Sequence, residues 1–169
     1  MATVHLLCGM ICAGKTTLAE RIRQETGAFP LSVDELMLSL FEPYMGDAYA
    51  PMLEKATEFL YRTAERMLDN GQDVTLDFGF WTPELRKAAR ERFERGGHIV
   101  LLHYLPITPE EWVVRVEKRN AEVHAGKAGV YSLDDNMRRT FPARFIPPTE
   151  AEYDILEPNE HDPELDRNV

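Results

Sequence analysis

The stretch from Gly9 to Thr16 constrains this chain more than any other. It reads GMICAGKT and fits the pattern G-x-x-x-x-G-K-[ST]. In such a loop the glycines let the backbone turn its N–H groups inward around an anion, the lysine adds a positive charge, and the hydroxyl ligates Mg²⁺. We therefore expect Lys15 at the β- and γ-phosphates of a nucleoside triphosphate and Thr16 at a Mg²⁺ ion.

The segments on either side of this loop fit the same interpretation. Residues 4–8 (VHLLC) form a short apolar run, which is typical of a buried parallel strand. Residues 15–26 read as a helix with Leu18 and Ile22 on one side. The helix dipole then adds to anion binding at the loop. The expected nucleotide-binding residues of the loop are Gly9, Cys12, Ala13, Gly14, Lys15, Thr16 and Thr17.

Length and charge limit the classes of function. With 169 residues and a formal net charge of −10, the chain fits one enzyme domain. A nucleic-acid binder usually needs a basic face, so nucleic acid is an unlikely partner, although a local basic cleft remains compatible with this charge. The sequence contains no apolar run of membrane-spanning length and no signal-peptide pattern, so no membrane partner is expected.

The two cysteines lie beside and within the phosphate loop. A disulfide between Cys8 and Cys12 would distort the loop, so we expect free thiols and a cytoplasmic protein. Cys12 is close to Lys15 and to a helix N-terminus, and both features lower a thiol pKa and favour a reactive thiolate. Burial in apolar surroundings would raise that pKa instead, leaving an inert small residue.

Strand and helix patterns alternate along the rest of the chain. After the first strand we expect strands at residues 28–33, 73–78, 98–105 and 153–156, and helices at residues 35–41, 51–70, 82–95, 108–120 and 132–139. Residues 121–131 read as a mobile loop. This alternation predicts an α/β layered fold with a mostly parallel sheet. Residues 1–157 form the expected P-loop domain, and residues 158–169 an acidic flexible tail.

Asp34 follows one expected strand and Asp77 ends the apolar run of another, and ligands in such folds bind beyond the carboxyl ends of the strands. Asp34 is a candidate base that takes the proton of a hydroxyl attacking the γ-phosphate. Its alternative role is a helix N-cap. Asp77 is a candidate ligand of Mg²⁺ or contact of the substrate, and its alternative role is a turn or cap residue.

The aromatic residues after Asp77 have two interpretations. Phe80 and Trp81 could wall a pocket for an apolar or ring-containing substrate. The alternative is core packing beneath the next helix.

Two arginines are spaced four residues apart before the expected mobile loop. Arg115 and Arg119 at the edge of a closing lid could clamp the triphosphate and neutralise charge during transfer. The alternative is a surface charge pattern matched by Glu111, Glu117 and Glu122.

Taken together, the segments GMICAGKTTLAERI, SVDEL, VTLDFGFWTPELR, HYLPITPEEWVVRVEKRN and RFIPPTEAE resemble small P-loop kinase-like ATP-binding proteins related to zeta toxins and chloramphenicol phosphotransferase. The resemblance covers nearly the whole chain. It implies a P-loop NTPase three-layer sandwich, with a five-stranded parallel sheet in the order 2-3-1-4-5 and a lid after strand 4. It also implies ATP and Mg²⁺ at Lys15 and Thr16, an acid such as Asp34 as substrate base, and Arg119 on the phosphates.

The sequence therefore predicts an ATP-dependent kinase that phosphorylates a hydroxyl of a small molecule, with Lys15, Asp34 and Arg119 as catalytic residues. The chain also resembles polynucleotide 5′-hydroxyl kinases, but there an arginine shortly follows the acid, whereas Glu35, Leu36 and Met37 follow Asp34 here. A third possibility is a module that binds ATP only as a conformational signal.

Overall fold

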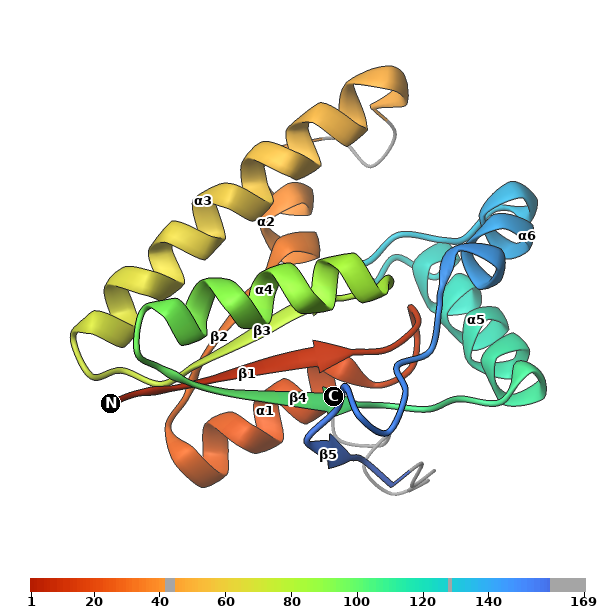
Figure 1. The fold of residues 1–169 in the computed structure, drawn as a ribbon. Helices are drawn as coiled ribbons and strands as arrows, with labels where there is room; N and C mark the ends of the chain where they lie inside the picture. The colour runs from red at the N-terminus through yellow and green to blue at the C-terminus, as the bar shows by residue number, and fades with distance from the viewer. Residues whose placement is uncertain (42–44, 128, 159–169) are drawn as a thin grey trace.

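The architecture is a five-stranded parallel sheet between two layers of helices. The computed structural model describes residues 1–41, 45–127 and 129–158. The strands are β1 (Thr3–Cys8), β2 (Phe29–Ser32), β3 (Val74–Gly79), β4 (Ile99–Tyr104) and β5 (Ile155–Leu156). They pair in the order β2-β3-β1-β4-β5, and every pairing is parallel. The sheet order implied by the sequence resemblance is thus confirmed (Figure 1).

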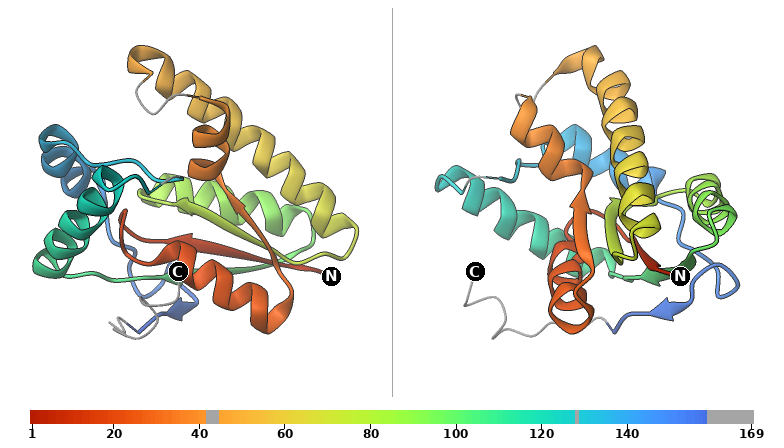
Figure 2. Two further views of the ribbon diagram at one scale, coloured as in Figure 1. Left: turned by 180° about the vertical axis from the view of Figure 1, so that it is seen from behind. Right: turned by 90° about the vertical axis from the view of Figure 1, so that its left-hand side faces the viewer.

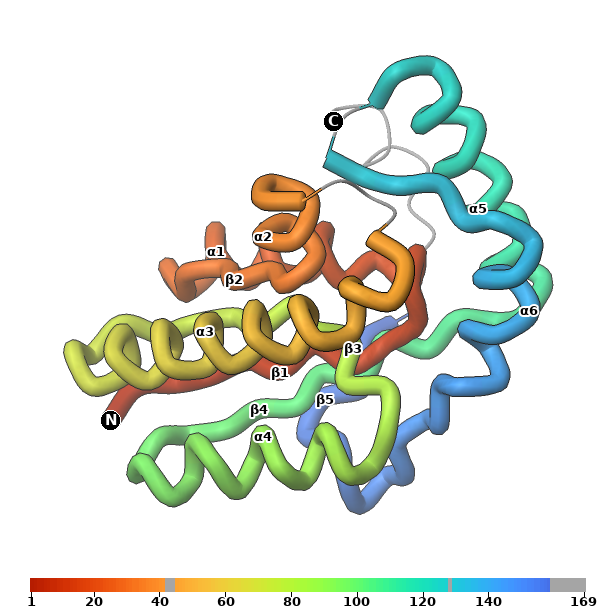
Figure 3. The backbone as a smooth tube through the Cα atoms, turned by 90° about the horizontal axis from the view of Figure 1, so that it is seen from above, coloured from red at the N-terminus to blue at the C-terminus, as the bar shows by residue number. Residues whose placement is uncertain are grey.

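The helices cover both faces of this sheet. They are α1 (Lys15–Thr26), α2 (Val33–Leu40), α3 (Tyr49–Asp69), α4 (Pro83–Arg95), α5 (Pro109–His124) and α6 (Asp135–Arg144), with a short 3₁₀ turn η1 at Gly46–Ala48. Helices α3 and α4 lie on one face and α1 on the other, while α5 and α6 lie beyond the carboxyl ends of the strands (Figures 1 and 3). The expected lid region after strand 4 is therefore occupied by α5, α6 and the segment between them.

Strand residues alternate between two hydrophobic cores, as the pleat of a β-strand requires. Val4, Leu6 and Cys8 face the core under α3 and α4, where Phe93 is fully buried. Leu7 faces the other core, with Leu18 and Ile22 of α1 and Trp112 and Val116 of α5. The two views of Figure 2 show the helical layers on either side of the sheet. Among the described residues, none of the helices combines the length and apolar character of a membrane span.

Helices α5 and α6 differ from their sequence-based expectations. Helix α5 continues to His124, so the first part of the expected loop at 121–131 is helical. Helix α6 begins at Asp135 and not at residue 132, and its N-cap is Asp134, whose side chain accepts a bond from the Met137 N–H. Helix α6 also extends to Arg144 and accommodates Pro142 in its last turn, where few backbone bonds remain to be lost.

The last strand is anchored by a buried polar contact. Strand β5 has only two residues, but the Glu157 side chain that follows it is 8% exposed. Its carboxylate lies 2.6 Å from His103 Nδ1 and 2.5 Å from Arg21 Nη2. Most of the expected flexible tail, at 159–169, lies outside the described residues.

Candidate active site

The phosphate loop connects β1 to α1 at the carboxyl edge of the sheet. Gly14 has φ +99°, a left-handed conformation that glycine adopts without strain. Cys12 also has a positive φ, at 65°, so a non-glycine residue takes a conformation that favours glycine. Lys15 Nζ donates to Met10 O at 2.8 Å, so its ammonium folds back across the loop. This shape matches the anion cradle that the motif predicts.

A hydroxyl and a carboxylate meet at the start of α1. Thr16 Oγ1 donates to Asp77 Oδ2 at 2.9 Å, and Asp77 is 8% exposed at the end of β3. A cavity of about 120 Å³ opens beside them, lined by Thr16, Ala19, Glu20, Pro30, Ser32, Glu35 and Asp77. Mg²⁺ prefers oxygen ligands and is usually held by one or two carboxylates together with substrate phosphates. Thr16 and Asp77 therefore fit a Mg²⁺ site by the chemistry of their oxygens.

Asp34 lies in the first turn of α2 and is not its cap. The N-cap is Ser32, whose side chain accepts a bond from the Glu35 N–H at 3.2 Å. The Asp34 side chain is exposed, yet the surrounding protein removes enough water to raise the pKa of its carboxyl. Lys15 lowers this pKa, as does Arg119, whereas Asp77 raises it. The charges that act on this carboxyl belong to the phosphate loop, β3 and α5.

Both arginines of α5 reach the phosphate loop. Arg115 Nη1 donates to Cys12 O at 3.3 Å, and Arg119 Nη1 lies 3.9 Å from Cys12 Sγ. Arg115 also pairs with Glu111 one turn away. The surface-pair interpretation is thus correct for one contact of Arg115, but it does not describe Arg119. The structure thus brings both arginines of α5 to the phosphate loop that contains Lys15.

The sequence of the chain matches a known protein family. A profile of the AAA-domain family matches residues 4–142 of the chain. The chain belongs to this family. The match spans the phosphate loop, both strand-end aspartates and both arginines of α5. No match was found among curated proteins.

Solved structures of kinases and of Kti12 have the same fold. The chain is similar to a protein described as a kinase from Chloroflexus aurantiacus, with 16% identity, coverage of 92% of this chain and 85% of that one, and a TM-score of 0.70. A sugar kinase from Janibacter sp. gives 17% identity, coverage of 98% and 90%, and a TM-score of 0.65. Kti12 from Chaetomium thermophilum, solved with ADP-AlF3, gives 16% identity, coverage of 98% of this chain and 94% of that one, and a TM-score of 0.65. The fold of this AAA-domain chain is therefore that of P-loop kinases, which together with its loop implies nucleotide binding.

For Cys12 and Phe80 the structure favours the alternative interpretation of the sequence. Burial raises the pKa of the Cys12 thiol, and the lowering effects of Arg119, Lys15 and Arg115 do not offset it, so the expected reactive thiolate is not favoured. Phe80 is 2% exposed and stacks on Phe78 with ring centres 5.8 Å apart. Its side chain packs in the core and does not line a substrate pocket.

Trp81 has a different environment from Phe80. It is half-buried, and its ring meets Phe141 of α6 edge-on at 5.2 Å between centres and Phe145 at 6.5 Å. It therefore joins the end of β3 to the region after α5. A contact between Trp81 and a substrate stays a prediction.

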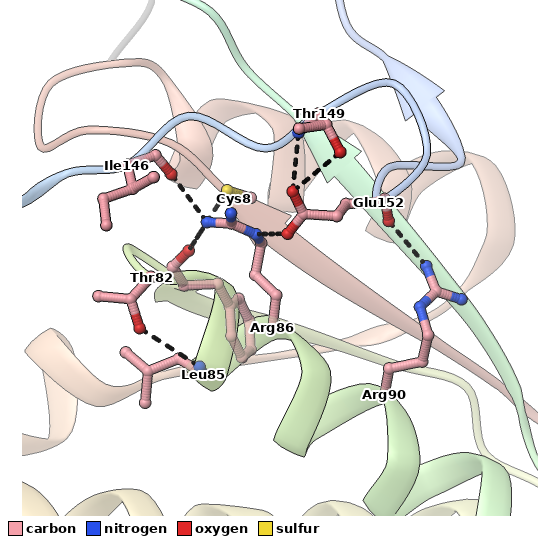
Figure 4. Close-up of polar contacts among 9 residues, drawn as sticks. Cys8, Thr82, Leu85, Arg86, Arg90, Ile146, Thr149 and Glu152 are labelled. Carbon is pink, nitrogen blue, oxygen red and sulfur yellow. Dashed lines mark hydrogen bonds and ion pairs between the residues drawn. The ribbon is translucent and has the colours of Figure 1, made fainter.

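The turn after β3 is hydrogen-bonded to the start of the phosphate loop. The sequence did not predict this contact. Gly79 O accepts a bond from the Gly9 N–H at 3.1 Å, and Phe80 has φ 46°. Arg86, 3% exposed, donates from Nη1 to Phe80 O at 3.1 Å and to Ile146 O at 2.9 Å, and from Nε to Glu152 Oε1 at 2.9 Å (Figure 4). Arg86 thus ties this strained turn to the segment that returns from α6.

Two tyrosines near Asp34 were also missed as individual site residues. Burial raises the pKa of Tyr49 at the start of α3, and the Asp34 carboxylate raises it further. Burial likewise raises the pKa of Tyr131, with contributions from Asp34 and Tyr49. Tyr49 lies in an aromatic-rich part of the sequence at residues 40–52, and this is the only sequence signal for it.

Proposed function

We propose that the chain is an ATP-dependent kinase that transfers the γ-phosphoryl group to a hydroxyl of a small molecule. One observation carries this proposal: Arg115 and Arg119 of α5 reach the phosphate loop, and Thr16 at the end of that loop meets the Asp77 carboxylate. Asp34 at the start of α2 is the candidate base, and Lys15 and Arg119 both lower the pKa of its carboxyl. A base, a phosphate cradle and cations at the phosphates are the parts that phosphoryl transfer uses.

The proposed reaction assigns a task to each of these groups. Asp34 accepts the proton of the acceptor hydroxyl as the hydroxyl oxygen bonds to the γ-phosphorus. The bond between that phosphorus and the β–γ bridging oxygen breaks, and the electron pair leaves with ADP. Lys15 and Arg119 stabilise the charge that spreads over the phosphoryl oxygens. Thr16 and Asp77 would hold Mg²⁺, which supplies charge neutralisation at the β- and γ-phosphates when bound.

Other observations support a small acceptor. The Janibacter neighbour is a sugar kinase, and the sequence resemblance to zeta toxins and chloramphenicol phosphotransferase points to a hydroxyl acceptor. The net charge of −10 opposes binding of a polyanionic acceptor such as a nucleic acid.

A library of small hydroxyl compounds, screened for ADP production with Mg-ATP, tests the proposal. We expect one chemical class to stimulate ADP release and Asp34→Asn to abolish the stimulation. Oligonucleotides with a free 5′-hydroxyl form a second arm, and their phosphorylation would favour the polynucleotide alternative. Tight ATP binding without stimulation by any compound would favour a non-catalytic module.

A further inference from the structure

The segment that follows α5 returns over the helix and is fixed to it. The Asn120 side chain donates from Nδ2 to Leu133 O at 2.8 Å and accepts from the Leu133 N–H at 2.8 Å. Leu133 is 2% exposed and packs in the core that contains Leu7 and Trp112. The two bonds from the Asn120 side chain to the Leu133 backbone, together with the buried Leu133 side chain, therefore fix the path of residues 131–133. These residues are called the return segment below.

The first residue of the return segment holds Arg119 in two ways. Arg119 Nε donates to Tyr131 O at 2.9 Å. The Arg119 guanidinium carbon also lies 4.9 Å from the centre of the Tyr131 ring, which is within the range of a cation–π contact. The backbone of Tyr131 makes one contact and its side chain makes the other. Together they restrain both the position and the plane of the Arg119 guanidinium.

The opposite edge of that guanidinium reaches the phosphate loop. Arg119 Nη1 lies 3.9 Å from the Sγ of Cys12, whose backbone has a left-handed conformation. The guanidinium therefore lies between the return segment and the phosphate loop. An arginine side chain has several rotatable bonds, so holding it in one conformation costs conformational entropy. A stack on Tyr131 that exists before ATP binds removes most of this cost from the binding step.

We propose that Tyr131 is a positioning residue that holds the Arg119 guanidinium over the phosphate loop, so that the return segment and the phosphate contact form as one unit. This inference rests on the proposed kinase function, because it takes the terminal phosphate of ATP as the group that Arg119 meets. Tyr131 acts through Arg119 and not by its own contact with the phosphates.

The test measures the affinity of Mg-ATP by calorimetry, with ADP in a parallel series. Tyr131→Leu removes the ring, and we expect it to weaken Mg-ATP binding about 3- to 10-fold, the range for a lost cation–π contact. ADP affinity should change less than twofold. Tyr131→Phe keeps the ring and should bind Mg-ATP like the unmodified protein. In the Arg119→Ala background, Tyr131→Leu should add less than a twofold further loss, because the group that it positions is gone.

Tyr61 offers a matched control. The Arg92 guanidinium lies 5.0 Å from the centre of the Tyr61 ring, in a stack between α3 and α4 away from the phosphate loop. Tyr61→Leu removes the same kind of contact and should leave Mg-ATP affinity unchanged. Circular dichroism establishes that each variant is folded, and Tyr131→Met replaces Tyr131→Leu if the latter does not fold.

The outcomes separate the proposal from the function on which it rests. Unchanged Mg-ATP affinity in the ring-less Tyr131 variant, or an equal loss with and without Arg119, would overturn the positioning role. The measurement needs no acceptor, so a protein that shows the expected pattern but phosphorylates nothing would refute the kinase proposal and leave the role of Tyr131 intact. Lys15→Ala should abolish Mg-ATP binding, and retained affinity in it would refute the assignment of the phosphate loop itself.

Discussion

The chemistry proposed at the residue scale depends most on Asp34. Its carboxyl has a raised pKa because the protein around it limits its hydration, while Lys15 and Arg119 oppose the shift. An ionised carboxylate in such a place is less stable than one in water, and this makes it a better proton acceptor.

Asp34→Asn should therefore separate activity from stability. We expect Mg-ATP affinity to change little and phosphoryl transfer to fall about 10²-fold or more, because the amide cannot accept a proton. Thermal stability at neutral pH should stay equal or rise, since Ser32 and not Asp34 caps α2 and a folded pKa above the unfolded value means that ionisation destabilises the fold. Calorimetric unfolding and transfer assays on the same preparation check this. A less stable variant with full transfer would contradict the role as base.

The assignment of Asp34 as the base also predicts how activity depends on pH. Asp34 must be deprotonated to act, so kcat/KM should fall as pH decreases through its pKa in the free enzyme. Because burial raises that pKa, the fall should begin at a higher pH than for an ordinary aspartate. The descending acid limb should be absent from the residual activity of Asp34→Asn.

At the scale of elements, Arg86 fastens α4 to two other segments. Arg86→Met keeps the buried apolar stem but leaves the Phe80 and Ile146 carbonyls and the Glu152 carboxylate short of a partner. We expect a loss of about 3 kcal/mol in the free energy of unfolding, as for other broken buried ion pairs. Lys87→Met is the matched control, since Lys87 is exposed and pairs with Glu91 one turn away, and it should change stability by less than about 0.5 kcal/mol. Urea unfolding of both variants checks the difference.

Strands β1, β4 and β5 are joined to α1 by a buried chain of polar groups. His5 Nδ1 lies 2.9 Å from His103 Nε2, and His103 in turn meets Glu157, which pairs with Arg21. Burial lowers the pKa of His5 to about 4, with a further lowering by His103 and an opposing effect of Asp73. The folded chain therefore holds His5 neutral at pH values where the unfolded chain already protonates it.

This difference gives a stability prediction with a definite sign. Between pH 6.5 and 4 the unfolded state binds more protons at His5, so the free energy of unfolding falls as pH falls through that window. At pH 4.5 the contribution is a loss of roughly 2 kcal/mol. His5→Gln cannot protonate and should lose correspondingly less stability between pH 7 and pH 4.5 in urea titrations. Equal losses in both proteins would show that His5 does not titrate as argued.

At the scale of the whole molecule, the sequence predicted the elements better than their contacts. The α/β alternation and the loop from Gly9 to Thr16 have local signatures, because a strand, a tight turn and a helix N-terminus each depend on adjacent residues. The sheet order came from resemblance to a family and is confirmed. The contact of Thr16 with Asp77 was not predicted as such, but it agrees with the rule that strand ends meet at one edge of a sheet.

Contacts between distant segments left no comparable signal. Arg86 reads as a surface charge of an amphipathic helix, yet it is 3% exposed because the turn at Phe80 and the residues after α6 close over it. Phe80 follows a strand whose alternation breaks at two positive φ values, so its inward direction could not be counted from the strand. The stack of Arg119 on Tyr131 depends on how the chain returns after α5, and spacing alone does not encode that path.

The central claim is that one loop, one carboxylate and one arginine transfer a phosphoryl group from ATP. Single-turnover transfer of a labelled γ-phosphoryl group to the acceptor found by the screen tests it most directly. We expect a labelled phosphomonoester with the unmodified protein and none with Lys15→Ala, because that variant does not hold ATP. With Asp34→Asn at matched ATP occupancy we expect at most about one hundredth of the rate. Transfer by Asp34→Asn at the full rate, or label released only as inorganic phosphate, would contradict it.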